Sequence, residues 1–308
     1  MSNTVTIKVP ATTANLGPGF DCIGAALSLY NRFKFYALTE EAIAVKIAVS
    51  GKESSRVTTD ETNLAYKAFV KLYAHIGKTP PPVSIEIDLD VPLARGLGSS
   101  ATAIVGGLVG ANQLAGAPLG ETELMELAIA IEGHPDNVVP ALLGGCRLAA
   151  TAGSQWAIAD IPWHPEIVPV VAIPDFELST AEARKVLPAD YSRADAIFNT
   201  AHLGLLVRAL ETGCGDWLRA AMQDKIHQPY RQTLIEGYEE VRSAALSAGA
   251  YEMVISGAGP TLLALTSPST ASAVAAAMGE AWKLQGVMPE VKVLSIENEG
   301  VTVDASGV

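Results

Sequence analysis

Alternating apolar and polar positions predict strands throughout the first third of the chain. Val5, Ile7 and Val9 alternate with polar residues, which is typical of a strand with one buried face. The same period of two recurs in three further segments. These strands are expected at 32–38, 43–49 and 83–89.

A period of three to four residues marks the expected helices, of which 64–76 is the plainest. Its apolar stripe ends at Gly77 and three consecutive prolines, and both signals stop a helix. The run 133–137 is expected to break a helix at 121–131, and 151–167 is expected to be irregular. Further helices are expected at 101–115, 180–186, 194–210, 217–225, 233–248 and 271–282, and further strands at 144–149, 167–173, 252–255, 261–266 and 291–296.

Strands and helices fall into two blocks without the regular alternation of a parallel α/β fold. This arrangement predicts the α+β class. The irregular segment that separates the blocks is the expected domain boundary, because boundaries fall where few contacts cross. The predicted domains are therefore residues 1–160 and residues 161–308.

Charge and composition exclude several classes of protein. The formal net charge of −12 over 308 residues argues against a nucleic-acid surface, for which a basic patch is expected. The first four residues lack the basic and apolar segments of a secretory signal, and no apolar run reaches the ~20 residues of a membrane span. Three cysteines without metal-ligand spacing suggest reduced thiols. A cytoplasmic protein without a membrane or nucleic-acid partner is expected.

The segment 92–103 carries the clearest chemical signal. A predicted strand leads into two glycines, Gly96 and Gly98, and a predicted helix leads out of them. The first amides of a helix lack intrahelical partners and the macrodipole adds positive charge, so this turn can bind an anion. No Gly-Lys-Ser/Thr follows, so the spacing is not that of a P-loop. A capped helix after a tight turn is the alternative.

Four motifs together resemble a known family. The pattern Pro-x-x-x-Gly-Leu-Gly-Ser-Ser-Ala at 92–101 resembles the phosphate-binding motif of the GHMP kinases, and the glycine-rich segment 255–261 resembles their C-terminal motif. The segments 10–21 and 134–137 resemble the homoserine kinase family within that superfamily. The resemblance extends over almost the whole chain.

This resemblance implies a two-domain α+β fold, with a ribosomal-S5-like N-terminal domain and a ferredoxin-like C-terminal domain. It also implies ATP-dependent phosphorylation of the L-homoserine hydroxyl, in threonine biosynthesis, with Mg²⁺. Two alternatives stay open: a GHMP kinase of the mevalonate or sugar type, and a non-catalytic nucleotide-binding relative. The sequence leaves open whether the protein forms a homodimer.

The resemblance also implies the residues that bind ATP and Mg²⁺. Asn63 corresponds to an adenine contact, although an asparagine there also suits a helix N-cap. Ser100 and Glu126 are the expected magnesium ligands, because related kinases have a Glu eleven residues before the position of Asn137; Glu132 is the second candidate. The phosphate-binding segment is expected to comprise Pro92, Leu93, Ala94, Arg95, Gly96, Leu97, Gly98, Ser99, Ser100, Ala101 and Thr102. Whether Arg95 contacts the triphosphate or lies in solvent is left open.

A zwitterionic substrate needs both charges in its site. Asp21 is expected to bind the ammonium group and Asn15 the amine or hydroxyl, while Arg184 and Arg231 can bind the carboxylate as planar donors. Thr180 is expected to reach the phosphate or substrate, with a helix N-cap as its alternative role. Gly257, in the C-terminal motif, completes the expected substrate site.

The substrate hydroxyl is expected to lie near Asn137. Several relatives have an Asp at that position, but an amide cannot accept a proton near neutral pH. Asp136 is adjacent, yet neighbouring side chains need not point the same way. We therefore expect no dedicated base, with the hydroxyl proton leaving late to the phosphate or to water, since a loose transition state demands little of its nucleophile. His134 is interpreted as a residue that organises this loop.

Overall fold

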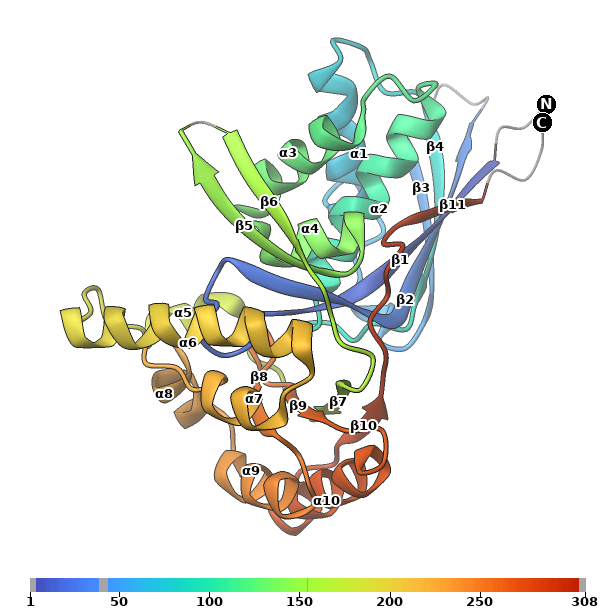
Figure 1. Cartoon of the computed structure of the whole chain (residues 1–308). Coiled ribbons are helices and arrows are strands. Elements are labelled where there is room, and N and C mark those ends of the chain that lie inside the picture. Colours follow the sequence, from blue (N-terminus) through green and yellow to red (C-terminus); the bar gives the residue numbers. More distant parts are fainter. Residues whose placement is uncertain (1–3, 39–43, 154, 305–308) are drawn as a thin grey trace.

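The computed structural model describes residues 4–38, 44–153 and 155–304. Residues 1–3 and Ile43, to which two of the sequence predictions extend, lie outside these ranges. Within the described ranges the chain forms two antiparallel or mixed sheets with helices packed against them (Figure 1).

The first sheet has the strand order β11-β1-β2-β4-β3, and β5 joins it by pairing with β2 and β6. Helices α1 to α4 pack against this sheet, and the last described strand returns to pair with β1 beside the N-terminal end (Figure 1). The strands are β1 (Thr4–Ala14), β2 (Ile23–Ala37), β3 (Val45–Gly51), β4 (Val83–Leu89), β5 (Cys146–Ala152), β6 (Gln155–Ile161) and β11 (Thr302–Asp304), and the helices are η1 (Ser54–Arg56), α1 (Leu64–His75), α2 (Ser99–Leu114), α3 (Glu121–Glu132) and α4 (Pro135–Leu143).

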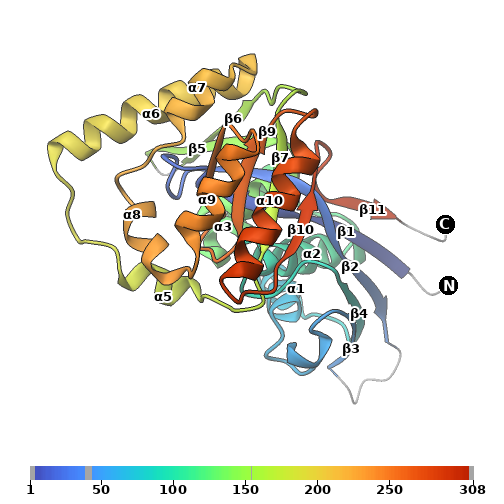
Figure 2. The same ribbon diagram turned by 90° about the horizontal axis from the view of Figure 1, so that it is seen from below.

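The second sheet has the order β10-β7-β9-β8, and all its pairings are antiparallel. Helices α9 and α10 lie side by side over one face of it (Figure 2). The chain order, strand–helix–strand–strand–helix–strand, is that of a ferredoxin-like domain. Its elements are β7 (Val168–Ile173), α5 (Thr180–Lys185), α6 (Arg193–Thr212), α7 (Gly215–Ala221), α8 (Gln228–Arg231), η2 (Gln232–Leu234), α9 (Tyr238–Ser247), β8 (Glu252–Ile255), β9 (Leu262–Thr266), α10 (Ala271–Leu284) and β10 (Glu290–Val293).

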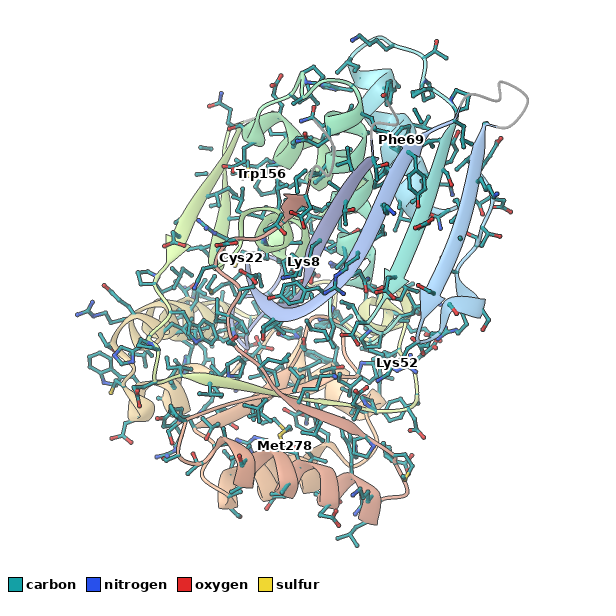
Figure 3. All side chains as sticks on the ribbon, turned by 90° about the vertical axis from the view of Figure 1, so that its right-hand side faces the viewer. Lys8, Cys22, Lys52, Phe69, Trp156 and Met278 are labelled. Carbon is teal, nitrogen blue, oxygen red and sulfur yellow. The ribbon has the colours of Figure 1, made fainter. Side chains whose placement is uncertain are left out.

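Small residues along α2 let this helix approach the first sheet closely. A Cβ atom at Gly106 would lie 2.5 Å from the ring of Phe33, and one at Gly110 would lie 2.3 Å from the ring of Phe35. Phe35 in turn stacks on Phe69 of α1, with ring centroids 5.9 Å apart (Phe69 is labelled in Figure 3). Helix α2, which begins at the glycine turn, is thereby packed closely against β2.

A separate apolar core joins the two sheets. It combines Leu16 and Leu97 from the first half with Val171, Leu263 and other residues from the second. At the edge of this junction, Lys52 Nζ lies 2.9 Å from a carboxylate oxygen of Glu290 on β10 (Lys52 is labelled in Figure 3). The halves are therefore packed on each other through an apolar layer.

The predicted α+β class is confirmed, and the helix at 64–76 and the strand at 83–89 closely match α1 and β4. Some local expectations were wrong. The strand expected through Val5, Ile7 and Val9 continues as β1 to Ala14, with a register shift after Pro10. Part of the segment expected to be irregular, 155–161, forms β6. The run 133–137 ends α3 as expected and also contains the start of α4, and 302–304, where no element was expected, pairs with β1 as β11. The division of the chain at residue 160 stays a prediction.

Among the described residues, no helix is long and apolar enough to cross a membrane.

Candidate functional site

The turn between β4 and α2 has the geometry of an anion site. Gly96 and Gly98 have φ values of +75° and +68°, a region that residues with a Cβ atom rarely adopt. Gly98 is the N-cap of α2, and it offers no side chain to the first amides of the helix. Those amides are left for a ligand, and an anion is favoured there by the helix dipole.

The second glycine-rich motif packs directly against this turn. Ser256 Oγ donates a hydrogen bond of 2.6 Å to the Gly96 carbonyl, and the Thr261 amide donates one of 3.2 Å to the Arg95 carbonyl. A Cβ atom at Gly96 would lie 2.2 Å from the Ser256 carbonyl oxygen. The two motifs are 160 residues apart in sequence and form one wall.

Gly96→Ala is expected to destabilise the fold by about 2–4 kcal/mol, because it combines left-handed strain with a backbone clash. Gly77→Ala is the matched control, since Gly77 also has a positive φ (+67°) but nothing lies within 4 Å of the position that an added methyl group would take. The measurement is urea unfolding of both variants. Equal losses in the two would show that the contact between the glycine motifs contributes nothing.

A cavity of about 310 Å³ opens in front of this wall. It brings together residues from both ends of the sequence that were predicted separately. Those predicted residues are Asn15, Asp21, Ala94, Arg95, Gly96, Gly98, Ser99, Ser100, Asn137, Thr180, Arg184, Arg231 and Gly257, and the wall also includes Glu132, His134, Asp136, Leu178, Ser179, Ala258 and Gly259.

A second cavity of about 340 Å³ lies on the other side of the turn and shares Ala94, Ser99 and Ser100 with the first. Its lining is largely apolar and includes Phe33, and Asn63 lies on its wall. Asn63 is the N-cap of α1: its Oδ1 accepts from the amides of the first helical turn, and its Nδ2 donates to the Thr58 carbonyl. The N-cap role is confirmed, and the adenine contact stays a prediction.

Some residues of the predicted phosphate-binding segment line the two cavities, and others support the glycine turn from below. Leu93 lines the second cavity, whereas Pro92 lines neither cavity. Leu97, Ala101 and Thr102 are fully buried beneath the turn. Thr102 Oγ1 donates to the Ser99 carbonyl and accepts from Asn31 Nδ2, so it supports the turn from below.

Arg95 is buried and fully engaged by the protein. Its guanidinium donates to the carbonyls of Leu93, Pro174 and Asp175 at 2.7 to 3.1 Å. It also forms ion pairs with Glu53 (3.2 Å) and Glu177 (3.0 Å). The alternative of a solvent-exposed side chain was therefore wrong, and Arg95 ties the turn to the segment that follows β7.

The structure places Glu132, and not Glu126, beside Ser100. Ser100 Oγ donates a 2.8 Å hydrogen bond to Glu132 Oε1 on the wall of the first cavity. Glu126 is exposed and lines neither cavity. It lies six residues earlier on α3, about 9 Å along the helix axis and about 120° around it.

The carboxylate beside Ser100 is therefore not the one expected from the spacing of eleven residues, and the connection that follows it, from α3 to α4, is short. Helix α3 runs to Glu132, and α4 starts at Pro135. The described residues contain no group of three His, Cys, Asp or Glu that could hold a metal. The hydroxyl of Ser100 and the carboxylate of Glu132 nevertheless suit Mg²⁺, which takes one or two protein oxygens together with substrate phosphates and water.

Asn137 lies against the glycine turn and accepts a 2.8 Å hydrogen bond from Thr12 Oγ1 on β1. Its neighbour Asp136 is buried on the cavity wall, and Asp136 Oδ1 lies 2.8 Å from His134 Nδ1. The hydrogen bond to Asp136 raises the pKa of His134. These are the contacts of a residue that organises the loop, as interpreted from the sequence.

Asp21 and Arg184, predicted to bind opposite ends of a zwitterion, bind each other. Arg184 donates two hydrogen bonds, of 2.8 and 3.0 Å, to the two oxygens of Asp21, and this pairing raises the pKa of Arg184. Both side chains are about a third exposed, at 34% and 38%. Asn15 supports the pair, because its Oδ1 accepts from the Asp21 amide and its Nδ2 donates to the Gly257 carbonyl.

Arg231 lies at the back of the same cavity with 1% of its surface exposed. It donates to the carbonyls of Ala183 (3.2 Å) and Gly257 (3.1 Å). Burial, followed by the nearby charge of Arg184, lowers the pKa of Arg231 to about 10, so it stays protonated at neutral pH. None of the ion pairs among the described residues involves Arg231, and a buried guanidinium of this kind is poised to bind an anion.

Thr180 is exposed at the mouth of this cavity, at the first position of α5. The N-cap of that helix is Ser179, whose Oγ accepts from the Glu182 amide in a capping box. The alternative role of Thr180 as an N-cap was therefore wrong by one residue. Its position on the cavity wall leaves its predicted contact with substrate open.

Sequence reasoning assigned no role to Thr12, Phe20 or His227, which surround the predicted residues. Phe20 lies beneath both arginines, with its ring centroid 5.6 Å from the guanidinium carbon of Arg184 and 5.0 Å from that of Arg231. Thr12 and Phe20 lie within the motif at 10–21, and this position could have identified them as residues of the site. His227 lies four residues before Arg231, and this spacing alone indicates no function.

Two family models match this chain. The model described as "GHMP kinases N terminal domain" matches residues 63–145, and that described as "GHMP kinases C terminal" matches residues 206–284. The chain superposes on the crystal structure of homoserine kinase from Cytophaga hutchinsonii with a TM-score of 0.90, at 29% identity, covering 99% of this chain and 98% of that one. The L. major mevalonate kinase, at 15% identity and a TM-score of 0.70, shares the fold.

Relatives found by sequence have a higher identity to this chain than the solved structures just named. The homoserine kinase of Trichodesmium erythraeum is 71% identical over 298 residues, which cover 97% of each chain. That of Trichormus variabilis is 68% identical over 97% of this chain and 99% of the relative. Family models, full-length identity and fold agree: the chain belongs to the homoserine kinases of the GHMP kinase family.

Proposed function

We propose that this chain transfers the γ-phosphoryl group of ATP to the side-chain hydroxyl of L-homoserine, releasing ADP and O-phospho-L-homoserine, as a step of threonine biosynthesis. The observation that carries the proposal is the pair of cavities that meet at Ser99 and Ser100. One cavity is largely apolar and suits a nucleoside, and the charged side chains of the other include Asp21, Arg184 and Arg231, which suit an amino acid.

Different groups of the site bind the different charged groups of the substrates. The amides of the glycine turn and the α2 dipole bind the phosphates. Asp21 binds the substrate ammonium and Arg231 its carboxylate, so the intramolecular pair between Asp21 and Arg184 exchanges for contacts with the zwitterion. Arg184 then joins Arg231 on the carboxylate. Thr180 closes the mouth of the cavity, and Asn63 orients the adenine side.

Phosphoryl transfer joins the homoserine oxygen to the γ-phosphorus and breaks its bond to the oxygen bridging the β-phosphate. Mg²⁺ bound with ATP neutralises phosphate charge, and Ser100 and Glu132 are the residues that would hold it. Glu132 thus takes the role first expected for Glu126. We further propose that the enzyme is cytoplasmic and that the boundary between its two domains lies near residue 160. The proposal is compatible with a homodimer.

Asn137 contacts the hydroxyl in this account without accepting its proton. Its Oδ1 already accepts from Thr12 Oγ1 beside the glycine turn, so it is held where the reacting groups meet. The proton of the hydroxyl leaves to the transferred phosphoryl group or to water.

Asp136→Asn is expected to lower kcat by less than about tenfold, because no dedicated base is needed, whereas loss of a general base costs about 10²–10⁴-fold. The buried position of Asp136 and its bond to His134 make the isosteric change the suitable one. The measurement is kcat with saturating ATP and homoserine. A loss of about 10²-fold or more with unchanged substrate binding would identify Asp136 as the base.

The proposed substrate is tested by coupled ADP release with homoserine, mevalonate and galactose side by side. Homoserine is expected to give the highest kcat/KM, because the other two compounds lack the ammonium and carboxylate pair. A signal for homoserine no greater than for the others would overturn the proposal.

A further inference from the structure

The imidazole of His227 is fully buried directly behind Arg231. His227 Nδ1 lies 3.4 Å from Arg231 Nη1, and His227 Nε2 lies 2.8 Å from the Gly17 carbonyl oxygen. The contacts that the guanidinium of Arg231 makes with the described residues involve Nε and Nη1. Among these residues no group accepts a hydrogen bond from Nη2. Nη2 is the nitrogen left for a ligand in the cavity.

These two contacts define the tautomer of the ring. A carbonyl oxygen only accepts, so Nε2 must carry the hydrogen that is donated to Gly17. In the neutral ring Nδ1 is then an acceptor, and it faces a guanidinium that only donates. A protonated ring would direct an N–H group and a positive charge at Arg231.

The surroundings favour the neutral ring. Burial lowers the pKa of His227 to about 4; the charge of Asp224 opposes this shift, and that of Arg231 adds to it. Asp224 Oδ2 is 3.6 Å from Nε2, beyond hydrogen-bond distance. The Asp224 carboxylate instead accepts from Asn199 Nδ2 and from three backbone amides at the start of α8. Asp21 is the other acidic group whose charge reaches this ring.

His227 also joins the two sides of the substrate cavity. Gly17, its hydrogen-bond partner, lies in the loop that carries Asn15 and Asp21. Phe20 of the same loop stacks on the His227 ring, with centroids 5.2 Å apart, and lies beneath Arg231. The imidazole therefore touches both the loop proposed to bind the ammonium and the arginine proposed to bind the carboxylate.

We propose that His227 is a positioning residue for carboxylate recognition: as the neutral Nε2–H tautomer it accepts a hydrogen bond from Arg231 and holds the guanidinium with Nη2 toward the substrate. This inference rests on the proposed function, in which Arg231 binds the homoserine carboxylate. It adds a determinant of specificity that touches no substrate atom.

Two substitutions test the hydrogen bonds of His227 with Gly17 and with Arg231 one at a time. The terminal amide of His227→Gln reaches the position of Nε2 and keeps a donor for Gly17, but it offers no acceptor at the position of Nδ1. The shorter His227→Asn places its Oδ1 near Nδ1 and keeps the acceptor for Arg231. Thermal unfolding of both variants measures any general loss of structure.

The readout compares ligands with and without the carboxylate. For His227→Gln the KM of homoserine is expected to rise by about tenfold or more, the scale of a hydrogen bond to a charged group, with the KM of ATP unchanged. The inhibition constant of 3-aminopropan-1-ol, which is homoserine without its carboxylate, is expected to stay within about threefold. His227→Asn is expected to retain most of the homoserine affinity.

A double-mutant cycle completes the test. In an Arg231→Leu background His227→Gln is expected to have no further effect on the KM of homoserine, because its partner is gone. Equal weakening of homoserine and 3-aminopropan-1-ol, or additive effects in the cycle, would overturn the inference and leave a structural role only. If Arg231→Leu itself leaves the preference for homoserine over 3-aminopropan-1-ol unchanged, the proposed role of Arg231 fails instead.

Discussion

Glu132→Gln is expected to lower kcat by about 10²–10³-fold, whereas Glu126→Gln keeps near-normal activity. Both residues lie on α3, but Ser100 Oγ is 2.8 Å from the Glu132 carboxylate in the cavity, and Glu126 is exposed away from both cavities. Glutamine keeps the size and one oxygen of Glu132 and removes its charge. The loss therefore reports on the charge that would hold Mg²⁺ against the triphosphate.

The two variants are compared by kcat at saturating substrates and by calorimetric titration with ADP in the presence and absence of Mg²⁺. For Glu132→Gln the gain in ADP affinity on adding Mg²⁺ is expected to shrink, and for Glu126→Gln to match that of the unaltered enzyme. The reverse order, with Glu126→Gln inactive, would restore the assignment made from the eleven-residue spacing.

Arg231→Leu is expected to raise the KM of homoserine by about 10²-fold and the KM of ATP by less than about threefold. The side chain is 1% exposed at the back of the amino-acid cavity and lines no part of the cavity around Asn63. Removing the buried guanidinium takes away one of the two charged donors proposed for the substrate carboxylate, and this cost falls on one substrate alone.

Arg219→Leu is the matched control, because Arg219 is an exposed arginine on α7 that pairs with Asp216 and lines neither cavity. Steady-state kinetics with each substrate varied in turn provide the measurement. Equal increases in both KM values for Arg231→Leu would contradict the assignment of Arg231 to the amino acid.

Local signals in the sequence predicted the elements that surround the glycine turn. Asn63 was recognisable as an N-cap, and β4, the glycines and the small residues of α2 follow each other in one short stretch of chain. Such features depend on residues that are close together in the sequence, and the structure contains them as expected. The α+β class followed from the order of the same elements.

Contacts between distant segments could not be predicted in this way. The pairing of Asp21 with Arg184 joins residues 163 positions apart, and the bonds of Arg95 to Pro174 and Asp175 span 79 and 80 positions. Each residue was recognised as functional or left open, but the sequence did not indicate that one would be the partner of the other. The same holds for β11, a three-residue strand that is stabilised by pairing with β1.

The choice between Glu126 and Glu132 could not be made from the sequence either. A spacing of eleven residues before Asn137 presupposes a fixed length of chain between the carboxylate and that position. Here only two residues separate the end of α3 from the start of α4, and the last residue of α3 lies beside Ser100. The register of a helix relative to a site depends on such a connection, and a change in its length moves another residue of the helix to the site.

A crystal structure with homoserine and a non-hydrolysable ATP analogue would show where both substrates bind. Homoserine is expected in the cavity lined by Asp21 and Arg231, with its carboxylate on Arg231 and its hydroxyl directed at the phosphates near Ser100, and with the pair between Asp21 and Arg184 opened. The adenine is expected beside Asn63. Homoserine bound elsewhere, or bound with its carboxylate on the glycine turn, would contradict the proposed division of the two cavities.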